Sequence, residues 1–205
     1  MAEGPPRLVV VTRGDAHERG AQRVAAELRD LADAGLAGVI LREPELEDGA
    51  LLALAAELRP HLAWLSVHDR VHVARAAGAD AAHLGWRSLD LAAARRAAGH
   101  LALGLSTHAE DDAATWAGAD YLVHGPVAPT PSKQGLVEPV GVVGFAAGRA
   151  RRPDPEVPML ALGGVTGELA PELLAAGAHG VAVIGAVLGA EEPRRALLDL
   201  ASAVG

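Results

Sequence analysis

One segment in the second half of the chain combines an apolar strand with groups that bind anions. Residues 118–135 read Gly-Ala-Asp-Tyr-Leu-Val-His-Gly-Pro-Val-Ala-Pro-Thr-Pro-Ser-Lys-Gln-Gly, so Thr130, Ser132 and Lys133 follow the strand closely. Lysine supplies a point charge, hydroxyls donate hydrogen bonds, and glycine lets backbone N–H groups approach an oxyanion. An ordinary proline-rich surface loop is the alternative, because turn-forming residues cluster in any connection. The position directly after a strand favours a phosphate site.

Other polar residues and glycines stand where further apolar runs end. They are Arg42, His68, Asp69, Ser106, His124, Gly163, Gly164 and Gly185. A histidine can transfer protons near neutral pH, and a glycine turn at a helix start exposes N–H groups to a phosphate. For the histidines a structural role is the alternative. For Gly163 and Gly164 it is close packing of a strand on a helix.

These candidates are positioned by a regular alternation of strands and helices. Apolar runs of strand length alternate with Ala-, Leu-, Arg- and Glu-rich stretches of helical period, such as 18–34, 89–98 and 168–176. The expected strands are 8–12, 38–42, 63–67, 81–84, 101–105, 121–124, 158–162 and 180–184.

A weak internal repeat supports this reading. A glycine separates helix from strand at 33–38, 77–82, 117–122 and 176–181, as expected for the residue that ends a helix. Near-continuous apolar strands indicate burial on both faces, as parallel sheets require. The sequence therefore predicts an α/β protein, a single (β/α)₈ TIM barrel, with an active face at the carboxyl ends of its strands. An open doubly wound sheet is the alternative.

Composition restricts the partners. With 205 residues, 50% of them hydrophobic, and no linker-like segment, we expect one domain over 1–205. The net charge of -8 argues against nucleic acid, and the absence of cysteine excludes disulfides and thiolate metal sites. The apolar stretch 173–190 is interrupted by glycines, so we expect no membrane span.

Further expectations concern location and cofactors. The first residues lack the charged and apolar regions of a signal peptide, so we expect a cytoplasmic protein. No Gly-x-Gly-x-x-Gly follows the first strand, so we expect no nucleotide cofactor. The sequence leaves the oligomeric state open, a homo-oligomer included.

Several motifs together resemble the thiamine phosphate synthase and thiazole tautomerase (TenI) superfamily. The motifs are Val-Ile-Leu-Arg-Glu at 39–43, His-Asp-Arg-Val at 68–71, Gly-Ala-Asp-Ala-Ala-His-Leu-Gly at 78–85, Gly-Leu-Ser-Thr-His at 104–108, Gly-Ala-Asp-Tyr at 118–121, Gly-Pro-Val-Ala-Pro-Thr-Pro-Ser-Lys at 125–133 and Ala-Leu-Gly-Gly at 161–164. The resemblance spans nearly the whole chain and implies the same barrel fold.

The synthase pattern implies a role for each matching residue. Thr130, Ser132 and Lys133 would hold the pyrophosphate of a hydroxymethylpyrimidine substrate, assisted by Arg42. Asp69 would bind Mg²⁺, and Ser106 would line the pyrimidine site. Gly164, with the backbone near Gly185, would hold a thiazole phosphate.

Departures from the synthase pattern bear on the activity. Ile40 and Pro44 replace a usual glutamine and lysine, while His68 and Ser88 replace an asparagine and the second metal-binding aspartate. A lone Asp69 holds Mg²⁺ weakly, since hard cations prefer carboxylate oxygens. The missing charge argues against full synthase activity and leaves the Mg²⁺ requirement doubtful.

Three functions remain open, and the departures favour the first. It is a tautomerase-like enzyme, or an otherwise diverged member of the superfamily, that binds a thiazole phosphate without obligatory metal. In the tautomerase-like enzyme His124 or His68 would be the group that shifts a proton. The tautomerase's own histidine position is Pro126 here, so that residue does not carry over. The second is a thiamine phosphate synthase with Mg²⁺, which would also bind the pyrimidine pyrophosphate. The third is a non-catalytic binder of thiamine intermediates.

Overall fold

Short runs rich in Val, Leu, Ile and Ala form parallel strands that close on themselves. In the computed structural model, which describes residues 4–130 and 138–205, the strands follow one another around a barrel, and the last pairs with the first. The strands are β1 (Leu8–Val11), β2 (Gly38–Leu41), β3 (Trp64–His68), β4 (Ala81–Leu84), β5 (Ala102–Thr107), β6 (Tyr121–His124), β7 (Met159–Leu162) and β8 (Gly180–Val183). The predicted (β/α)₈ barrel is confirmed.

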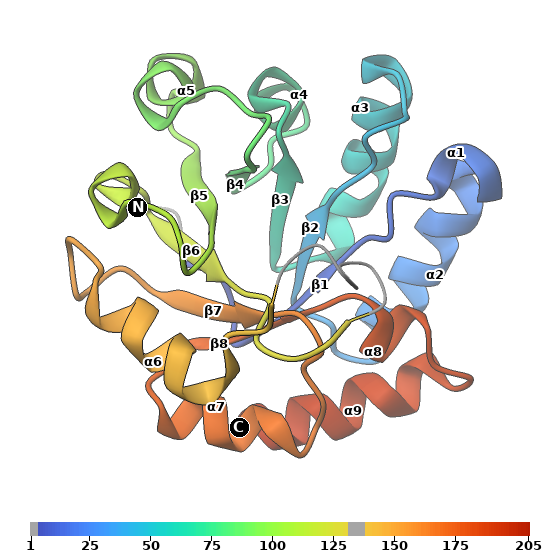
Figure 1. The fold of residues 1–205 in the computed structure, drawn as a ribbon. Helices are drawn as coiled ribbons and strands as arrows, with labels where there is room; N and C mark the ends of the chain where they lie inside the picture. Colours follow the sequence, from blue (N-terminus) through green and yellow to red (C-terminus); the bar gives the residue numbers. More distant parts are fainter. Residues whose placement is uncertain (1–3, 131–137) are drawn as a thin grey trace.

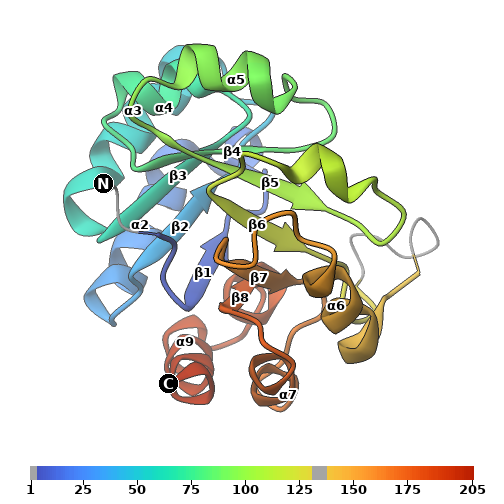
Figure 2. The same ribbon diagram turned by 90° about the vertical axis from the view of Figure 1, so that its left-hand side faces the viewer.

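Helices surround the barrel on the outside (Figures 1 and 2). They are α1 (Ala16–Arg19), α2 (Ala21–Asp33), α3 (Asp48–Leu58), α4 (Val71–Ala76), α5 (Leu91–Ala98), α6 (Gly141–Ala150), α7 (Leu169–Ala175), α8 (Gly185–Leu188) and α9 (Pro193–Val204), with short 3₁₀ turns η1 (Arg59–His61) and η2 (Ala113–Trp116). The helix expected over 18–34 is divided in two, because Gly20 adopts a φ of 87° that interrupts it.

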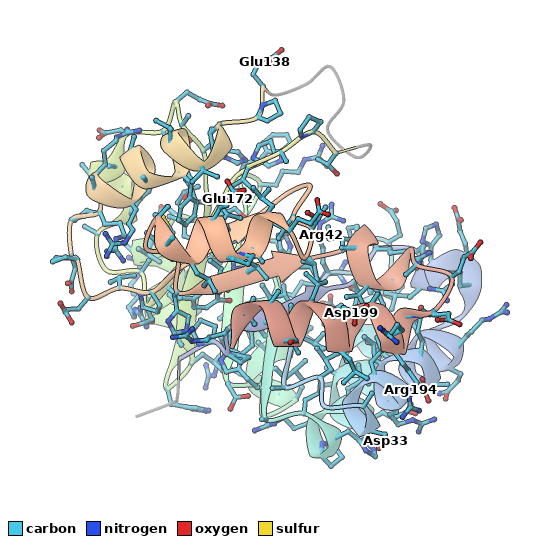
Figure 3. The ribbon with its side chains drawn as sticks, turned by 90° about the horizontal axis from the view of Figure 1, so that it is seen from below. Asp33, Arg42, Glu138, Glu172, Arg194 and Asp199 are labelled. Atoms are coloured by element: carbon cyan, nitrogen blue, oxygen red, sulfur yellow. The ribbon has the colours of Figure 1, made fainter. Side chains whose placement is uncertain are left out.

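The last helix, α9, runs across the outside of the barrel beside α2 (Figure 3). An ion pair joins the two helices, with Nη1 of Arg194 lying 2.7 Å from Oδ1 of Asp30. In the parts of the chain that the structure describes, none of the helices combines the length and the apolar character needed to cross a membrane.

Alternation along each strand divides the core into two layers, because successive side chains point to opposite faces. The outer layer packs the strands against the helices and includes Val10, Val39 and Leu65. The inner layer fills the barrel with Val9, Ile40 and other buried side chains. Polar residues at inward-facing positions therefore converge in the barrel interior.

Candidate active site

A chain of hydrogen bonds crosses the interior of the barrel. The Tyr121 hydroxyl on β6 lies 3.0 Å from Oγ of Ser66 on β3 and 3.2 Å from Nδ1 of His83 on β4. The other nitrogen of that imidazole, Nε2, lies 2.9 Å from Oγ of Ser106 on β5. Four strands thus share one polar network, and Ser106 lies at its end nearest the carboxyl ends of the strands.

Glycine on β5 makes room for this network. Gly104 pairs with Tyr121 in the sheet register, and a Cβ at position 104 would lie 2.0 Å from Cζ of the tyrosine. The ring of Tyr121 therefore lies across Gly104, so that its hydroxyl reaches His83 and Ser66.

The network is polar but uncharged. Burial, and then the neighbouring His68, lower the pKa of His83 to about 3, so its imidazole is neutral at physiological pH. Burial also raises the pKa of the Tyr121 hydroxyl above its ordinary value. Neutral donors and acceptors in the barrel interior favour a neutral polar ligand beside them over an ion.

His68 lies next to this network, closer to the mouth of the barrel. Its ring centroid is 5.7 Å from that of His83, and burial followed by the charge of Arg42 lowers its pKa to about 4, while Asp69 opposes the shift. Gly85 lies against the same imidazole, since a Cβ there would be 3.1 Å from Nε2 of His68. His68 is therefore also neutral near pH 7.

Two charged residues of the candidate site, Arg42 and Asp69, lie at the mouth of the barrel. Arg42 is exposed, and its backbone exchanges two hydrogen bonds with the Thr12 hydroxyl at 2.8 and 3.0 Å, which fixes the end of β2 beside β1. Asp69 is exposed at the end of β3 and has a φ of 71°, a left-handed conformation that is uncommon for residues other than glycine. Its N–H donates to the carbonyl of His83 at 2.7 Å, so the turn is anchored to β4.

Glu43 is a positioning residue that the sequence argument did not single out. It is buried, and its carboxylate accepts hydrogen bonds from the N–H groups of Gly14 at 3.3 Å and Ala16 at 2.8 Å. These bonds hold the loop after β1 against the loop that begins with Arg42. An acidic residue directly after a strand-end arginine is the signal that could have identified it.

The glycines after β7 accommodate the segment that follows β6. Gly163 and Gly164 have φ values of 98° and 66°, and a Cβ at position 164 would lie 2.6 Å from the carbonyl oxygen of Pro129. The Ala128 N–H donates to the Gly163 carbonyl at 2.9 Å. Both glycines pack against the loop after β6 and not, as the alternative had expected, against a helix, and their phosphate role stays a prediction.

Two other predicted phosphate ligands, Gly185 and Thr130, are among the described residues. Gly185 begins α8, and a Cβ there would meet nothing within 4 Å, so its backbone is open on that side. Thr130 directly follows the packed segment and is half-buried. Ser132 and Lys133 lie outside the described residues.

His124 does not point to the mouth. It is buried on the outer face of β6, where its Nδ1 lies 2.9 Å from the Thr107 hydroxyl. Its ring packs between Trp116 and Phe145, at a centroid distance of 6.0 Å from each. The alternation of side chains along β6 turns residue 124 toward the helices. The structure thus separates His124 from Ser106 and His68.

Asp69 is the residue of this site that could hold a metal ion. Mg²⁺ commonly takes one or two carboxylates together with waters and substrate phosphate oxygens, and Asp69 fits that arrangement. Oγ of Ser88 is engaged at 2.7 Å with the N–H of Gly85, and Asp90 caps α5 by accepting from the Ala93 N–H. Within residues 4–130 and 138–205, no group of three or more histidine, aspartate or glutamate side chains could hold a metal. A single carboxylate suits an ion that takes its other ligands from water or from a bound ligand, not a prebuilt cage.

Comparison with known proteins gives a consistent result. The family model described as thiamine monophosphate synthase matches residues 8–187. A protein of Geobacter sulfurreducens, provisionally named a thiamine-phosphate synthase, is 41% identical and covers 98% of this chain and 96% of its own length. A thiamine-phosphate synthase of Mycolicibacterium gilvum is 37% identical over 88% of this chain and 83% of its own.

Solved structures agree. The thiamine phosphate pyrophosphorylase of Pyrococcus furiosus superposes with a TM-score of 0.81 at 29% identity, covering 97% of this chain and 95% of that one. The resemblance to the thiamine phosphate synthase and TenI superfamily is confirmed. The prediction that the protein is an enzyme of that superfamily is confirmed as well. The chain belongs to the thiamine monophosphate synthase family.

Proposed function

We propose that this protein is a thiamine phosphate synthase, which joins hydroxymethylpyrimidine pyrophosphate to a thiazole phosphate and releases pyrophosphate. The relatives named thiamine-phosphate synthase favour this function over the tautomerase that the sequence departures favoured. The observation that carries the proposal is the distribution of charge in the site. A neutral polar interior below a charged mouth suits a substrate with a neutral ring and an anionic tail.

In this proposal the pyrimidine ring lies at the mouth of the barrel and meets Ser106. The Ser106 hydroxyl is held by Nε2 of His83, and the low pKa of His83 keeps the surroundings of the ring neutral. The diphosphate remains at the mouth, where Arg42 supplies positive charge. By family resemblance, Thr130, Ser132 and Lys133 complete the diphosphate site.

The reaction forms a C–N bond from the thiazole nitrogen to the methylene carbon of the pyrimidine and breaks the C–O bond to diphosphate. Negative charge grows on the departing diphosphate, so cationic groups placed there lower the barrier. Mg²⁺, when bound, would supply further charge stabilisation at these oxygens, and Asp69 would be its protein ligand. Gly164 and Gly185 would hold the thiazole phosphate on the side of β7 and β8.

The tautomerase alternative lacks a suitable proton-transfer group among the two histidines considered for it. A group that moves protons efficiently near neutral pH should have a pKa near the working pH. The pKa of His68 is about 4, and His124 faces the helix layer. The placement and titration of these residues therefore give that alternative no support.

The test is a product assay with both substrates and Mg²⁺. We expect pyrophosphate and thiamine phosphate in equal amounts, and a Ser106→Ala variant that is slower, with the exposed Ser202→Ala variant as the matched control. Conversion of a thiazole carboxylate phosphate tautomer without pyrophosphate release would instead support the tautomerase. Tight binding of thiazole phosphate with no turnover of either substrate set would support a non-catalytic binder.

A further inference from the structure

The turn after β4 places a tryptophan in solvent at the rim of the candidate active site. Trp86 is 82% exposed, and Leu89 in the same loop is 56% exposed. Scattered apolar side chains on a surface need no explanation, but a large aromatic ring beside a substrate pocket is a candidate contact for ligand. Trp64 and Trp116, by contrast, are buried at 3% and 2% exposure.

The turn that carries Trp86 is held rigidly. The N–H of Ser88 donates to the carbonyl of Gly85 at 3.0 Å, and the N–H of Gly85 donates back to Oγ of Ser88 at 2.7 Å. Trp86 and Arg87 are the two central residues of this closed turn. A preorganised turn presents its side chains with a small entropic cost on binding.

The turn is also part of the wall of the site. It begins at Gly85, which lies against the imidazole of His68, two residues after His83 in the polar network. Strand β4 lies between β3 and β5, whose ends carry Asp69 and Ser106. The turn therefore lies on the side of the mouth opposite β7 and β8. Because the proposed function places the thiazole phosphate near β7 and β8, the turn borders the half of the site that would hold the pyrimidine.

Trp86 and Arg87, the two central residues of the turn, combine an aromatic ring with a cation. The guanidinium carbon of Arg87 lies 4.5 Å from the centroid of the Trp86 ring, so one indole face is covered by a cation. Trp86 is 82% exposed in spite of this contact, so most of the side chain is open to solvent. Arg87 also adds a positive charge to this turn.

We propose that Trp86 is a substrate-positioning residue for the pyrimidine diphosphate, and that its indole forms an outer wall against which the bound pyrimidine packs. This inference rests on the proposed synthase function and adds to it a residue on the turn after β4. Stacking of an aromatic side chain on a nucleobase commonly contributes about 1–3 kcal/mol, which corresponds to roughly 5- to 150-fold in affinity.

Fluorescence tests the contact directly, since Trp86 is exposed while Trp64 and Trp116 are buried. Hydroxymethylpyrimidine monophosphate, which lacks the diphosphate leaving group, serves as an unreactive probe. We expect it to shift the emission of the wild-type protein to shorter wavelength and to reduce quenching by acrylamide. In Trp86→Phe the shift should disappear although the probe still binds in calorimetry.

Kinetics provide the second readout. We expect Trp86→Ala to raise KM for the pyrimidine diphosphate by about tenfold, within the range of aromatic stacking, with kcat and KM for thiazole phosphate nearly unchanged. Trp86→Phe should restore most of the loss, and Leu89→Ala, an exposed residue of the same loop, should resemble wild type.

Three outcomes would overturn the inference. If the wild type makes thiamine phosphate and Trp86→Ala keeps the wild-type KM and probe affinity, the role of Trp86 is refuted. The synthase function then remains intact. A change in oligomeric state on Trp86→Ala, measured by sedimentation, would assign the tryptophan to contact between copies of the chain. Failure of the wild type to bind the pyrimidine probe or release pyrophosphate would refute the proposed function itself.

Discussion

The Tyr121 hydroxyl links polar groups that come from two other strands. It lies within hydrogen-bond distance of Ser66 and of His83, and all three residues are buried. We expect Tyr121→Phe to lower the free energy of unfolding by about 1–3 kcal/mol, because the removed hydroxyl leaves buried partners unsatisfied. Urea unfolding of the variant and wild type measures the difference.

A double-mutant cycle distinguishes the loss of the hydrogen bond between Tyr121 and Ser66 from a simple loss of side-chain volume. Ser66→Ala removes the other end of the same hydrogen bond. The two substitutions together should cost less than the sum of the single costs, because the partners are then removed as a pair. Strict additivity would mean that the hydroxyls do not interact.

Ser88 and Pro44 are uncharged residues at positions where the synthase pattern has an aspartate and a lysine. Ser88 accepts from the Gly85 N–H, and an aspartate could accept the same bond while it adds a carboxylate to a turn that lies against His68, the residue before Asp69. We expect Ser88→Asp with Pro44→Lys to raise synthase activity and to lower the Mg²⁺ concentration needed for half-maximal rate, since added carboxylate and ammonium groups favour metal and diphosphate. Initial rates across a Mg²⁺ series, with EDTA as the zero point, measure both effects.

The control for this pair is Glu168→Asp, a conservative change at the beginning of α7, outside the turn after β4. It should leave the Mg²⁺ dependence as in wild type. A double variant with unchanged Mg²⁺ dependence and rate would show that the site differs from the family pattern in geometry as well as in charge.

At the scale of elements, β5 must lack a side chain where it faces the tyrosine of β6. A Cβ at Gly104 would lie 2.0 Å from Cζ of Tyr121, far inside van der Waals contact. We expect Gly104→Ala to destabilise the protein by about 3 kcal/mol or more, because the ring must move and the network with it. Thermal unfolding checks the stability, and the pyrimidine affinity should fall in parallel.

Gly49 supplies the matched control. It lies in the first turn of α3, and a Cβ there would meet no atom within 4 Å. Gly49→Ala should be neutral or stabilise the protein by up to about 1 kcal/mol, because alanine loses less backbone entropy in a helix. Equal destabilisation by both substitutions would contradict the packing argument for β5.

At the scale of the whole molecule, buried histidines make stability depend on pH. The pKa values of His68, His83 and His124 are lowered to about 4, 3 and 4, chiefly by burial. The unfolded chain, with histidine pKa values of about 6.5, binds more protons between about pH 6.5 and 4. The contribution of these neutral histidines is therefore complete above pH 6.5 and is lost as the pH falls through that window.

We expect the free energy of unfolding to fall by about 1.4 kcal/mol per pH unit for His83 alone within this range. Urea unfolding at pH 7, 6 and 5 measures the slope. His124→Gln should reduce it, because one buried imidazole is removed, while the exposed His61→Gln should leave it unchanged. Stability that stays constant from pH 7 to 5 would contradict the neutral, buried state of these side chains.

The sequence by itself determined the fold and the family. Apolar runs such as 9–11 and 181–183 indicate parallel strands buried on both faces, and glycines such as Gly177 mark where a helix ends before the next strand. These signals are local, since they depend on side-chain hydrophobicity and on allowed φ values, so they can be read without coordinates. The departure at Ser88 is also visible in the sequence, although the tautomerase reading drawn from such departures is not the one that the relatives favour.

Only the tertiary structure decided which polar residues share one space. The barrel turns His83 toward Tyr121 and Ser106, while His124 is turned to the helix layer. A shift of one residue along a strand exchanges its inner and outer faces, and the closure of the barrel joins residues far apart in the chain. Sequence spacing therefore predicts that these residues lie near strand ends, but the register of the closed sheet determines which of them meet.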